Sequence, residues 1–378
     1  MIDRRTLKKF DFTLFIVTIL IITFGLIILS SATHATMTRG GDSLAYVKRQ
    51  AASIFLGLIT ILILLKIDYS GMVKYANFIY VLNIVLLLAV LVIGDEQNGA
   101  KSWILLGPYN FQPSEFAKIA MIFTFAVYLA NREGKLNKFT DLLPTFALFG
   151  VPMALIMKQP DLGTALVFIG IYFGMLFVAG ARTRNIIILI LTGALLVAGT
   201  LTVQIGFNLD GPLKKHQLER LVIFVDPYKD PRGAGYHVIQ SQVSLGSGGL
   251  WGKGLYKGTQ TQLNFLPEQK NDFIFSVVGE ELGFAGSSLL LLLFFIFVHR
   301  GIKIAKSSKD MLGTLLATGF VSMIVFHLLV NIGMAGGIMP ITGIPLPFFS
   351  YGGSSMLANM LGVGILMNVY ARRQVLTF

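Results

Sequence analysis

The chain lacks cysteine altogether and carries little charge. Without cysteine, the chain has neither a disulfide framework nor a thiolate zinc site. Charged residues make up 13% of the 378 residues, about half their usual share in a soluble globular protein. Hydrophobic residues make up 54%, and the mean hydropathy is +0.72. The uncharged residues fall in long runs, which excludes a soluble enzyme, a disordered chain and a fibrous one. The sequence predicts a membrane protein.

Ten uncharged or nearly uncharged segments approach the length of about 20 residues that a helix needs to cross the hydrocarbon core. The stretch Met311–Ala371 is too long for one crossing and is divided near Pro340, Pro345 and Pro347, because prolines do not continue a helix. The other eight segments, of which the second and fifth are short, are Phe12–Thr33, Gln50–Leu65, Tyr75–Gly94, Phe111–Ala130, Leu142–Met157, Leu162–Ala181, Asn185–Leu209 and Leu282–His299. We expect an all-α polytopic membrane protein with ten transmembrane helices, in which residues 1–378 form a single membrane domain.

The basic residues indicate the orientation, because short cytoplasmic loops carry an excess of Lys and Arg. When the ten segments cross the membrane one after another, 17 of the 31 basic residues lie on the same side as the N-terminus. Eight more lie in the stretch Gly206–Asn271, and a loop of that length escapes the rule. We therefore expect both termini in the cytoplasm and one long extracytoplasmic loop at about residues 206–271. That loop carries aromatic residues, so it is expected to fold against the outer face of the bundle.

Ionisable groups inside a membrane are costly and usually face a cavity, a partner or a substrate path. Here they gather in the outer halves of the predicted spans, at Glu115, Lys118, Lys158, Asp161, Asp272, Glu280 and Glu281. Glu115 and Lys118 are three residues apart, so they share a helix face and can pair. With Asp161, they either neutralise one another and pin helices together or contact a substrate directly. The two roles are compatible.

Other polar positions carry weaker signals. Asp272 precedes the apolar run Phe273–Val278, which places a carboxylate at the water–lipid boundary. From spacing alone, an acid at a helix start, favoured by the helix dipole, is the simpler interpretation. Interhelical hydrogen bonding explains His327 and Asn331, which lie four residues apart on one helix face. The glycine-rich run at residues 246–254 is a weak signal for a phosphate or sugar contact.

The sequence lacks the motifs of several functional classes. The sequence has no His, Asp and Glu cluster with metal-site spacing and no nucleotide-binding loop, so a nucleotide-driven pump is not expected. A secondary transporter tends to hold its polar site near the bilayer midplane, on broken helices in repeated halves. In this chain the ionisable groups lie toward the outer surface, and no repeat is evident. This favours chemistry on a molecule presented at the outer leaflet.

Short strings run in order through nearly the whole chain: Asn98-Gly-Ala-Lys-Ser-Trp103, Phe111-Gln-Pro-Ser-Glu-Phe-Ala-Lys118, Lys158-Gln-Pro-Asp-Leu-Gly-Thr164, Gln217-x-x-Arg220, Phe265-Leu-Pro-Glu268, Asp272-Phe-Ile-Phe275, Glu280-Glu-Leu-Gly-Phe284 and Pro347-Phe-Phe-Ser-Tyr-Gly-Gly-Ser-Ser355. Together they resemble the SEDS family (shape, elongation, division and sporulation), most closely its rod-shape branch. The chain departs from the family at Asn271, where Thr is common, and at Ser102, where many members have Arg. Lys101 is therefore the candidate cation beside Trp103.

The resemblance implies a peptidoglycan glycosyltransferase of the bacterial cytoplasmic membrane. Such enzymes polymerise lipid II, a prenyl-diphosphate-linked disaccharide peptide, at the outer face of the membrane, here during cell elongation. The implied partner is a class B penicillin-binding protein, which is a transpeptidase. A lipid II flippase and a non-catalytic scaffold of the cell-wall machinery are the alternatives.

The resemblance also implies roles for individual residues. It makes Asp272 the essential carboxylate and general base. It assigns the polar network beneath this carboxylate to Glu115, Lys118 and Asp161. It assigns the contacts to the diphosphate or precursor to Arg49 and Arg220. No metal ligand is assigned, and a divalent cation, Mg²⁺ or Mn²⁺, is the one cofactor that the chemistry leaves open.

Overall fold

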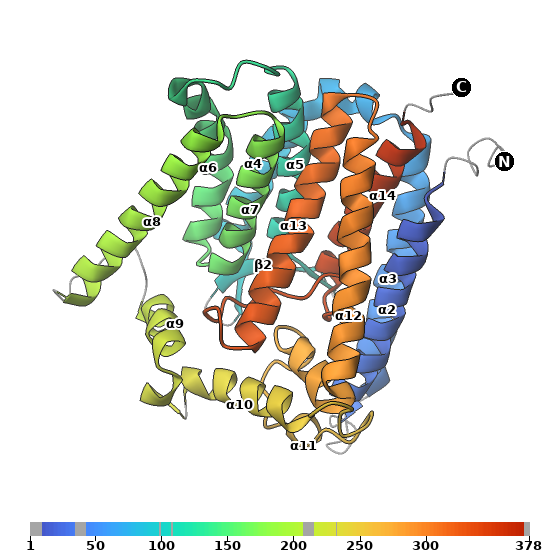
Figure 1. The fold of residues 1–378 in the computed structure, drawn as a ribbon, viewed down its shortest axis with the longest axis vertical. Coiled ribbons are helices and arrows are strands. Elements are labelled where there is room, and N and C mark those ends of the chain that lie inside the picture. The colour runs from blue at the N-terminus through green and yellow to red at the C-terminus, as the bar shows by residue number, and fades with distance from the viewer. Residues whose placement is uncertain are drawn as a thin grey trace.

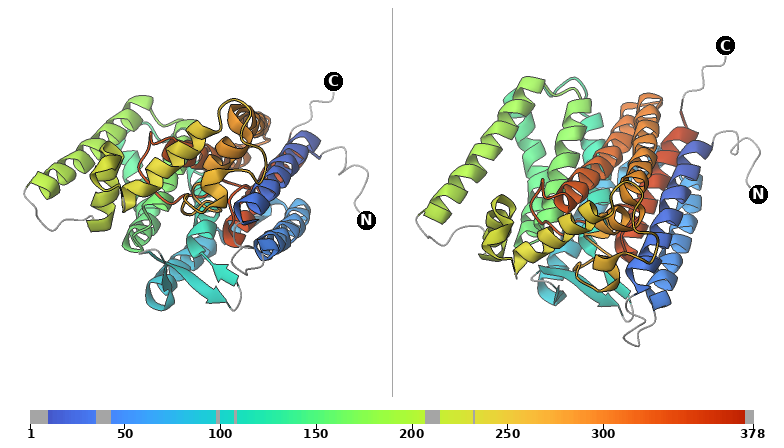
Figure 2. Two further views of the ribbon diagram at one scale, coloured as in Figure 1. Left: turned by 90° about the horizontal axis from the view of Figure 1, so that it is seen from below. Right: turned by 60° about the horizontal axis from the view of Figure 1, so that its bottom comes forward.

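The protein is a bundle of long helices that run roughly along one axis (Figure 1). The structure is a computed structural model, and it describes residues 10–34, 43–97, 100–106, 109–206, 215–231 and 233–373. Helix α2 begins and helix α14 ends at one end of the bundle, while helices α9, α10 and α11 lie across the other end (Figures 1 and 2). We call these the inner and the outer end.

The prediction of an all-α polytopic fold is confirmed. The long helices are α2 (Phe12–Ala32), α3 (Ser43–Lys66), α4 (Ala76–Ile93), α5 (Pro113–Ala130), α6 (Leu143–Lys158), α7 (Leu162–Val178), α8 (Thr183–Gly206), α12 (Ile274–Lys306), α13 (Met311–Ala335) and α14 (Gly353–Ala371). The 3₁₀ turns η2 (Tyr69–Tyr75) and η3 (Phe139–Leu142) lead into α4 and α6. Within the described residues nine helices, counted with these turns, are long and apolar enough to cross a membrane. The tenth, α7, is apolar but has 17 residues.

Polar residues at the helix starts explain several boundaries. The Asp11 carboxylate accepts the Leu14 N–H at 3.0 Å and caps α2, and Asp310 accepts the Gly313 N–H at 2.8 Å and caps α13. Pro113 occupies the first turn of α5, where its missing N–H leaves no helical hydrogen bond unmade.

Helix α13 lies at the centre of the bundle and packs against α5, α7, α12 and α14. By contrast, α8 leans away from the bundle (Figure 1) and packs mainly on α7. The apolar window of α8 is only 6% buried, against 61% for α13. An apolar helix that neighbours leave uncovered is matched to a lipid environment, so the exposed faces of α8 indicate contact with the bilayer.

The outer end contains structure that the hydrophobic pattern did not predict. A small antiparallel sheet, in the order β1 (Asp95–Gln97), β2 (Ala100–Leu106) and β3 (Tyr109–Phe111), lies between α4 and α5. The long outer loop forms α9 (Lys215–Val225), η4 (Pro227–Lys229), α10 (Ala234–Ser247) and α11 (Thr259–Gln262). Because α10 packs against α12 and α13, the prediction that this loop folds onto the bundle is confirmed.

Two predicted spans were wrong in extent. The second span is not short, since α3 has 24 residues and begins at Ser43. The eighth span starts at Ile274 rather than Leu282, and α12 runs for 33 residues with non-helical backbone at Gly283. The predicted start was too late because the charged residues Glu280 and Glu281 were taken to lie outside the span. The helix includes both residues, and their carboxylates accept hydrogen bonds from the outer loop, Glu280 from Lys253 and Glu281 from Gln262.

Candidate active site

A cavity of about 730 Å³ lies among the outer ends of the helices. Its walls come from α3, the β2–β3 hairpin, α5, α7, α9, α10 and α13, and from the two segments that precede α12 and α14. Of the residues that the sequence analysis singled out, the cavity brings together Arg49, Glu115, Lys118, Asp161, Arg220, Asp272 and His327. A set of positions spread over the whole chain therefore converges on one site.

Asp272 lies just before α12, outside the membrane-spanning helices. Its Oδ2 faces Gly343, 3.5 Å from where a β-carbon would sit on that glycine. The pKa of Asp272 is raised to about 7, first by burial and then by the negative charge of Glu268, while the charge of Arg220 opposes the rise. This carboxyl group therefore changes protonation near neutral pH.

In the same cavity, a buried chain of polar groups joins α5 to α13. Lys118 Nζ lies 2.8 Å from Glu115 Oε1 and 3.0 Å from His327 Nε2, and all three side chains are buried. His327 Nδ1 lies 3.1 Å from the carbonyl oxygen of Pro345. Because a carbonyl only accepts, Nδ1 carries the proton and Nε2 accepts from the ammonium. Lys118 is thus held from two helices at once.

Asp161 begins α7 and lines the same cavity. Its Oδ1 accepts the Thr164 N–H at 2.9 Å, and its Oδ2 accepts the Thr164 hydroxyl at 2.8 Å. Thr164 therefore holds this carboxylate in place, and the charge of Lys118 acts on it through space. The three predicted network residues share one site, and the direct ion pair is the one between Glu115 and Lys118.

Besides Lys118 of α5, three cations line the cavity, each from a different part of the chain. Arg49 comes from α3 and Arg220 from α9. Lys270, which the sequence analysis did not single out, lines the cavity from the segment before α12. Its Nζ lies 3.3 Å from the Tyr46 hydroxyl and 4.4 Å from the centroid of the same ring. The Tyr46 ring in turn meets the edge of Tyr351 at 5.1 Å.

Lys101 is not among the residues that line the cavity. Its Nζ donates to the carbonyl oxygens of Leu91 and Val92, at 3.2 and 3.3 Å. These carbonyls belong to the last turn of α4, where a cation is favoured by the helix dipole. The structure thus places Lys101 at a helix end and apart from the other predicted site residues.

Glu268 and His237 also line the cavity, and the sequence carries no signal for His237. Glu268 has a positive φ of 46°, and its carboxylate accepts the Asn271 amide at 2.7 Å. Glu268 is the last residue of the Phe265-Leu-Pro-Glu268 string, and this string is the sequence signal for its place in the site. Burial lowers the pKa of His237, the charge of Glu268 opposes the shift and Arg220 adds to it. His237 is therefore expected to be neutral at pH 7.

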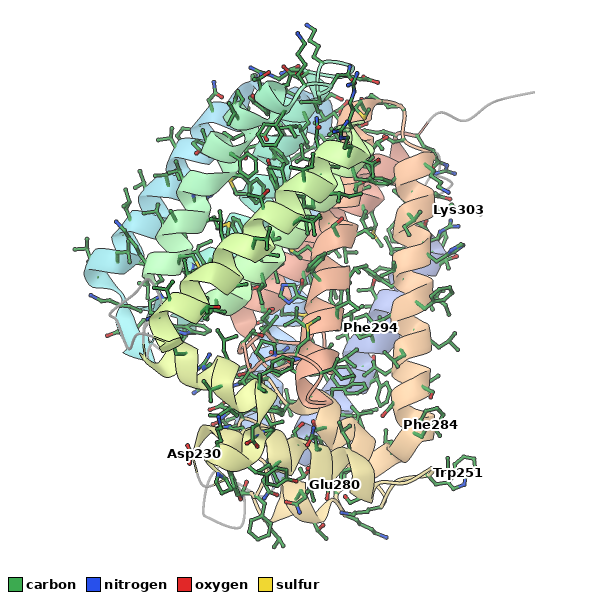
Figure 3. All side chains as sticks on the ribbon, turned by 60° about the vertical axis from the view of Figure 1, so that its left-hand side comes forward. Asp230, Trp251, Glu280, Phe284, Phe294 and Lys303 are labelled. Carbon is green, nitrogen blue, oxygen red and sulfur yellow. The ribbon has the colours of Figure 1, made fainter. Side chains whose placement is uncertain are left out.

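The glycine-rich run lies outside the cavity and is tied to α12. Lys253 Nζ donates to the Glu280 carboxylate at 2.8 Å, and the N–H groups of Lys253 and Gly254 donate to the carbonyl oxygens of Glu280 and Glu281, at 3.0 and 2.9 Å. Figure 3 shows Glu280 of α12 at the outer end of the protein, with Trp251 of the glycine-rich run projecting away from the bundle. These contacts give the run a structural explanation, and it contributes no residue to the cavity lining.

Within the residues that the structure describes, no group of three or more His, Cys, Asp or Glu side chains is placed to hold a metal ion. Asp272 and Glu268 are two carboxylates that line the cavity close together. They do not form a dedicated metal cage. The expectation of a divalent cation stays a prediction.

Comparisons with known proteins agree on one family. The family model FTSW_RODA_SPOVE, described as "Cell cycle protein", matches residues 11–375. The chain is 38% identical to Stage V sporulation protein E of Bacillus subtilis (strain 168), over 95% of this chain and 96% of the relative. It is 36% identical to peptidoglycan glycosyltransferase MrdB of Escherichia coli (strain K12), over 95% and 94%. A solved chain from work on "structural coordination of polymerization and crosslinking by a peptidoglycan synthase complex" superposes with a TM-score of 0.78 at 32% identity, over 96% and 97%.

Proposed function

The chain belongs to the SEDS family of FtsW, RodA and SpoVE proteins, and from this premise we propose that its outer cavity polymerises lipid II into glycan strands. The chain is then a peptidoglycan glycosyltransferase, as its relative MrdB is named. The observation that carries the proposal is the convergence of a half-buried carboxylate, Asp272, with the cations Arg49 and Arg220 in one cavity.

The reaction joins two sugars, and Asp272 acts as its general base. A sugar hydroxyl of the acceptor attacks the anomeric carbon of the donor and forms the new glycosidic C–O bond. The bond from that carbon to the diphosphate oxygen breaks, and its electron pair leaves with the lipid diphosphate. The proton of the attacking hydroxyl passes to Asp272. A base is most effective when its pKa lies near the working pH, which the raised pKa of about 7 satisfies.

The leaving diphosphate needs positive charge and no general acid, because it is stable as an anion. Arg49 and Arg220 supply planar donors suited to phosphate oxygens. One carboxylate therefore suffices, in contrast with glycoside hydrolases, which pair two. We assign Glu115, Lys118 and Asp161 to the wall of the cavity, where the fixed charge of Lys118 offsets the carboxylates around it. The described residues provide no metal cage, so no step is assigned to a metal ion.

The proposal also fixes the surroundings in which the enzyme works. We place the protein in the bacterial cytoplasmic membrane with both termini in the cytoplasm, so that the cavity opens at the outer face, and we assign it to cell elongation. The partner is a class B penicillin-binding protein. The solved complex that the chain resembles supports such a partner, since it concerns both polymerization and crosslinking.

The test is polymerisation of lipid II by purified Asp272→Asn protein beside wild type, with products separated on a gel. Asparagine keeps the shape of the side chain but takes up no proton. General-base catalysis contributes about 10²–10⁴-fold, so product formation should fall by that factor while lipid II binding survives. Asp95→Asn, an exposed outer carboxylate that does not line the cavity, is the control and should polymerise normally.

Near-normal polymer from pure Asp272→Asn protein would remove this carboxylate from the mechanism and make Glu268 the next candidate. The flippase and scaffold alternatives predict that pure wild-type protein makes no glycan. Reconstituted vesicles separate the two, because a flippase moves lipid II between leaflets and a scaffold does not.

A further inference from the structure

The main chain that carries Asp272 is held at three consecutive residues. Each carbonyl of residues 270–272 accepts a hydrogen bond from a different donor outside the segment. The pairs are Tyr351 N–H to Lys270 O at 2.9 Å, Ser350 Oγ to Asn271 O at 2.6 Å and Asn331 Nδ2 to Asp272 O at 2.8 Å. The donors come from the turn before α14 and from α13. The segment is therefore fixed before α12 begins.

Asn331 has a second role in the same place. Its Nδ2 also donates to the carbonyl oxygen of Ile344, at 2.7 Å, and its side chain is completely buried. Ile344 adjoins Gly343, the glycine that faces Asp272 Oδ2. Both amide protons are thus used, one on each of the two main chains that border the carboxylate. Rotating or removing this amide would take the donor from the buried Ile344 carbonyl and from the partly buried Asp272 carbonyl.

We infer that Asn331 is a positioning residue for polymerisation: its amide locks the main chain of Asp272 to the wall at Ile344 and so keeps the carboxylate aimed into the cavity. The inference rests on the proposed function, in which Asp272 takes the proton. A base must lie within hydrogen-bond reach of the proton that it removes, and a displacement of about 1 Å can lower a rate by about 100-fold. Asn331 touches no reacting atom and acts through Asp272.

The chain offers a matched control in Asn368. This asparagine of α14 is also buried, at 4% exposure, and its Nδ2 donates to two main-chain carbonyls, those of Leu64 and Ile67. It lies near the inner end of the bundle, where α3 ends, and does not line the cavity. Replacing either asparagine with alanine removes the same chemistry, but at different distances from Asp272.

The experiment compares Asn331→Ala and Asn368→Ala in the full chain, with kcat and KM for lipid II polymerisation and the melting temperature measured on folded, monodisperse protein. We expect both variants to melt at a lower temperature. We expect the kcat of Asn331→Ala to fall about 10- to 100-fold with KM nearly unchanged, and the kcat of Asn368→Ala to stay near wild type. Equal kcat values for the two variants, whether both high or both low, would overturn the inference.

A second measurement separates positioning from independent loss of structure. Because Asn331 acts through Asp272, adding Asn331→Ala to Asp272→Asn should lower the residual rate no further, and a further fall of about tenfold or more contradicts the inference. If Asn331→Ala does not fold, Ser350→Ala loosens the same main chain at Asn271, and an unchanged kcat there overturns it. Failure of the proposed function is recognised separately, by a wild-type protein that makes no glycan or by a fully active Asp272→Asn.

Discussion

At the scale of single residues, the site depends on keeping one carboxylate basic enough to accept a proton. Asp272 reaches a pKa of about 7 through burial first, then through the charge of Glu268, against the opposing charge of Arg220. Asp161 adds a smaller rise. Burial and three charged groups, Glu268, Arg220 and Asp161, therefore set the protonation of the base. Their separate contributions can be measured.

The pH dependence of polymerisation should report this balance. Below its pKa, Asp272 is protonated and cannot act as a base, so the rate should fall as the pH drops through about 7. Glu268→Gln removes a charge that raises the pKa and should move this acid limb to lower pH. Arg220→Gln removes a charge that lowers the pKa and should move the limb to higher pH. Initial rates across the pH range would measure both shifts, and shifts in the same direction would contradict the assignment.

The ion pair between Glu115 and Lys118 should be costly to break from one side only. Removing one partner of a buried pair leaves an unpaired charge and typically costs about 3–5 kcal/mol. Lys118→Met should therefore lower both thermal stability and activity, and the double change with Glu115→Gln should restore stability better than activity. Melting temperature and polymerisation rate of the same preparations measure the two effects.

The control for this prediction is Lys309→Met. Lys309 and Asp310 form an ion pair at 4.0 Å with both side chains about a third exposed, and exposed pairs contribute about 0–1 kcal/mol. A melting temperature as low for Lys309→Met as for Lys118→Met would mean that burial of the pair is not the cause. Unchanged stability and activity in Lys118→Met would make the network incidental.

Sequence reasoning identified most of the charged site residues but not all of its lining. Glu115, Lys118 and Asp161 stand out because charge is rare inside apolar helices, and Asp272 because it ends the outer loop. Lys270 and Tyr46 carry no such signal. Their contact joins positions 224 residues apart, and the fold alone decides that α3 meets the segment before α12.

At the scale of elements, helix α12 shows how a glycine lets a charged loop and an apolar helix meet. Gly283 has a φ of 66° and interrupts the helix just after Glu280 and Glu281. A β-carbon there would lie 2.4 Å from the Gly252 nitrogen and 2.7 Å from the Leu250 carbonyl oxygen. The backbone of the glycine-rich run therefore approaches α12 where only hydrogen is small enough.

Gly283→Ala should consequently destabilise the protein by about 1–3 kcal/mol or more, since it adds both backbone strain and a clash with main-chain atoms. Gly193→Ala in α8 is the matched control. A β-carbon at Gly193 meets nothing within 4 Å, so that variant should be neutral or gain up to about 1 kcal/mol. Thermal unfolding in detergent measures both, and equal melting temperatures would show that the close approach does not matter.

Hydrophobic length predicted the helices of the bundle but not its outer end. The spans are long and apolar, so their existence follows from the cost of leaving a backbone unpaired in lipid. The three-stranded sheet of β1, β2 and β3 has at most seven residues per strand, too few for a strong alternation of apolar and polar residues. The start of α12 was misplaced because charge was taken as its limit, whereas Glu280 is paired with Lys253.

At the scale of the whole molecule, polarity divides the bundle along its axis. The loop helices α9 to α11 lie across the outer end (Figure 1). The cavity, with the ion pair of Glu115 and Lys118 in its wall, lies among the outer ends of the helices. The inner end is held by other pairs, such as Arg300 with Asp11 at 2.7 Å. The intervening surface is apolar, as expected for a bundle that spans a bilayer.

This polarity, with the bias of basic residues, predicts that the cavity faces away from the cytoplasm. Since the chain has no cysteine, single cysteines can report the topology. Trp251→Cys is at the outer end, where the side chain is 83% exposed. Lys135→Cys is exposed between α5 and α6, at the inner end. We prefer Trp251 to its neighbour Lys253, because Lys253 pairs with buried Glu280.

In right-side-out membrane vesicles, a thiol reagent that cannot cross the bilayer should label Trp251→Cys and spare Lys135→Cys. After the vesicles are opened with detergent, both variants should be labelled equally, which controls for the reactivity of the two thiols. Labelling of Lys135→Cys alone in sealed vesicles would invert the orientation. The cavity would then open to the cytoplasm, and polymerisation at the outer face would have to be abandoned even if the purified enzyme made glycan.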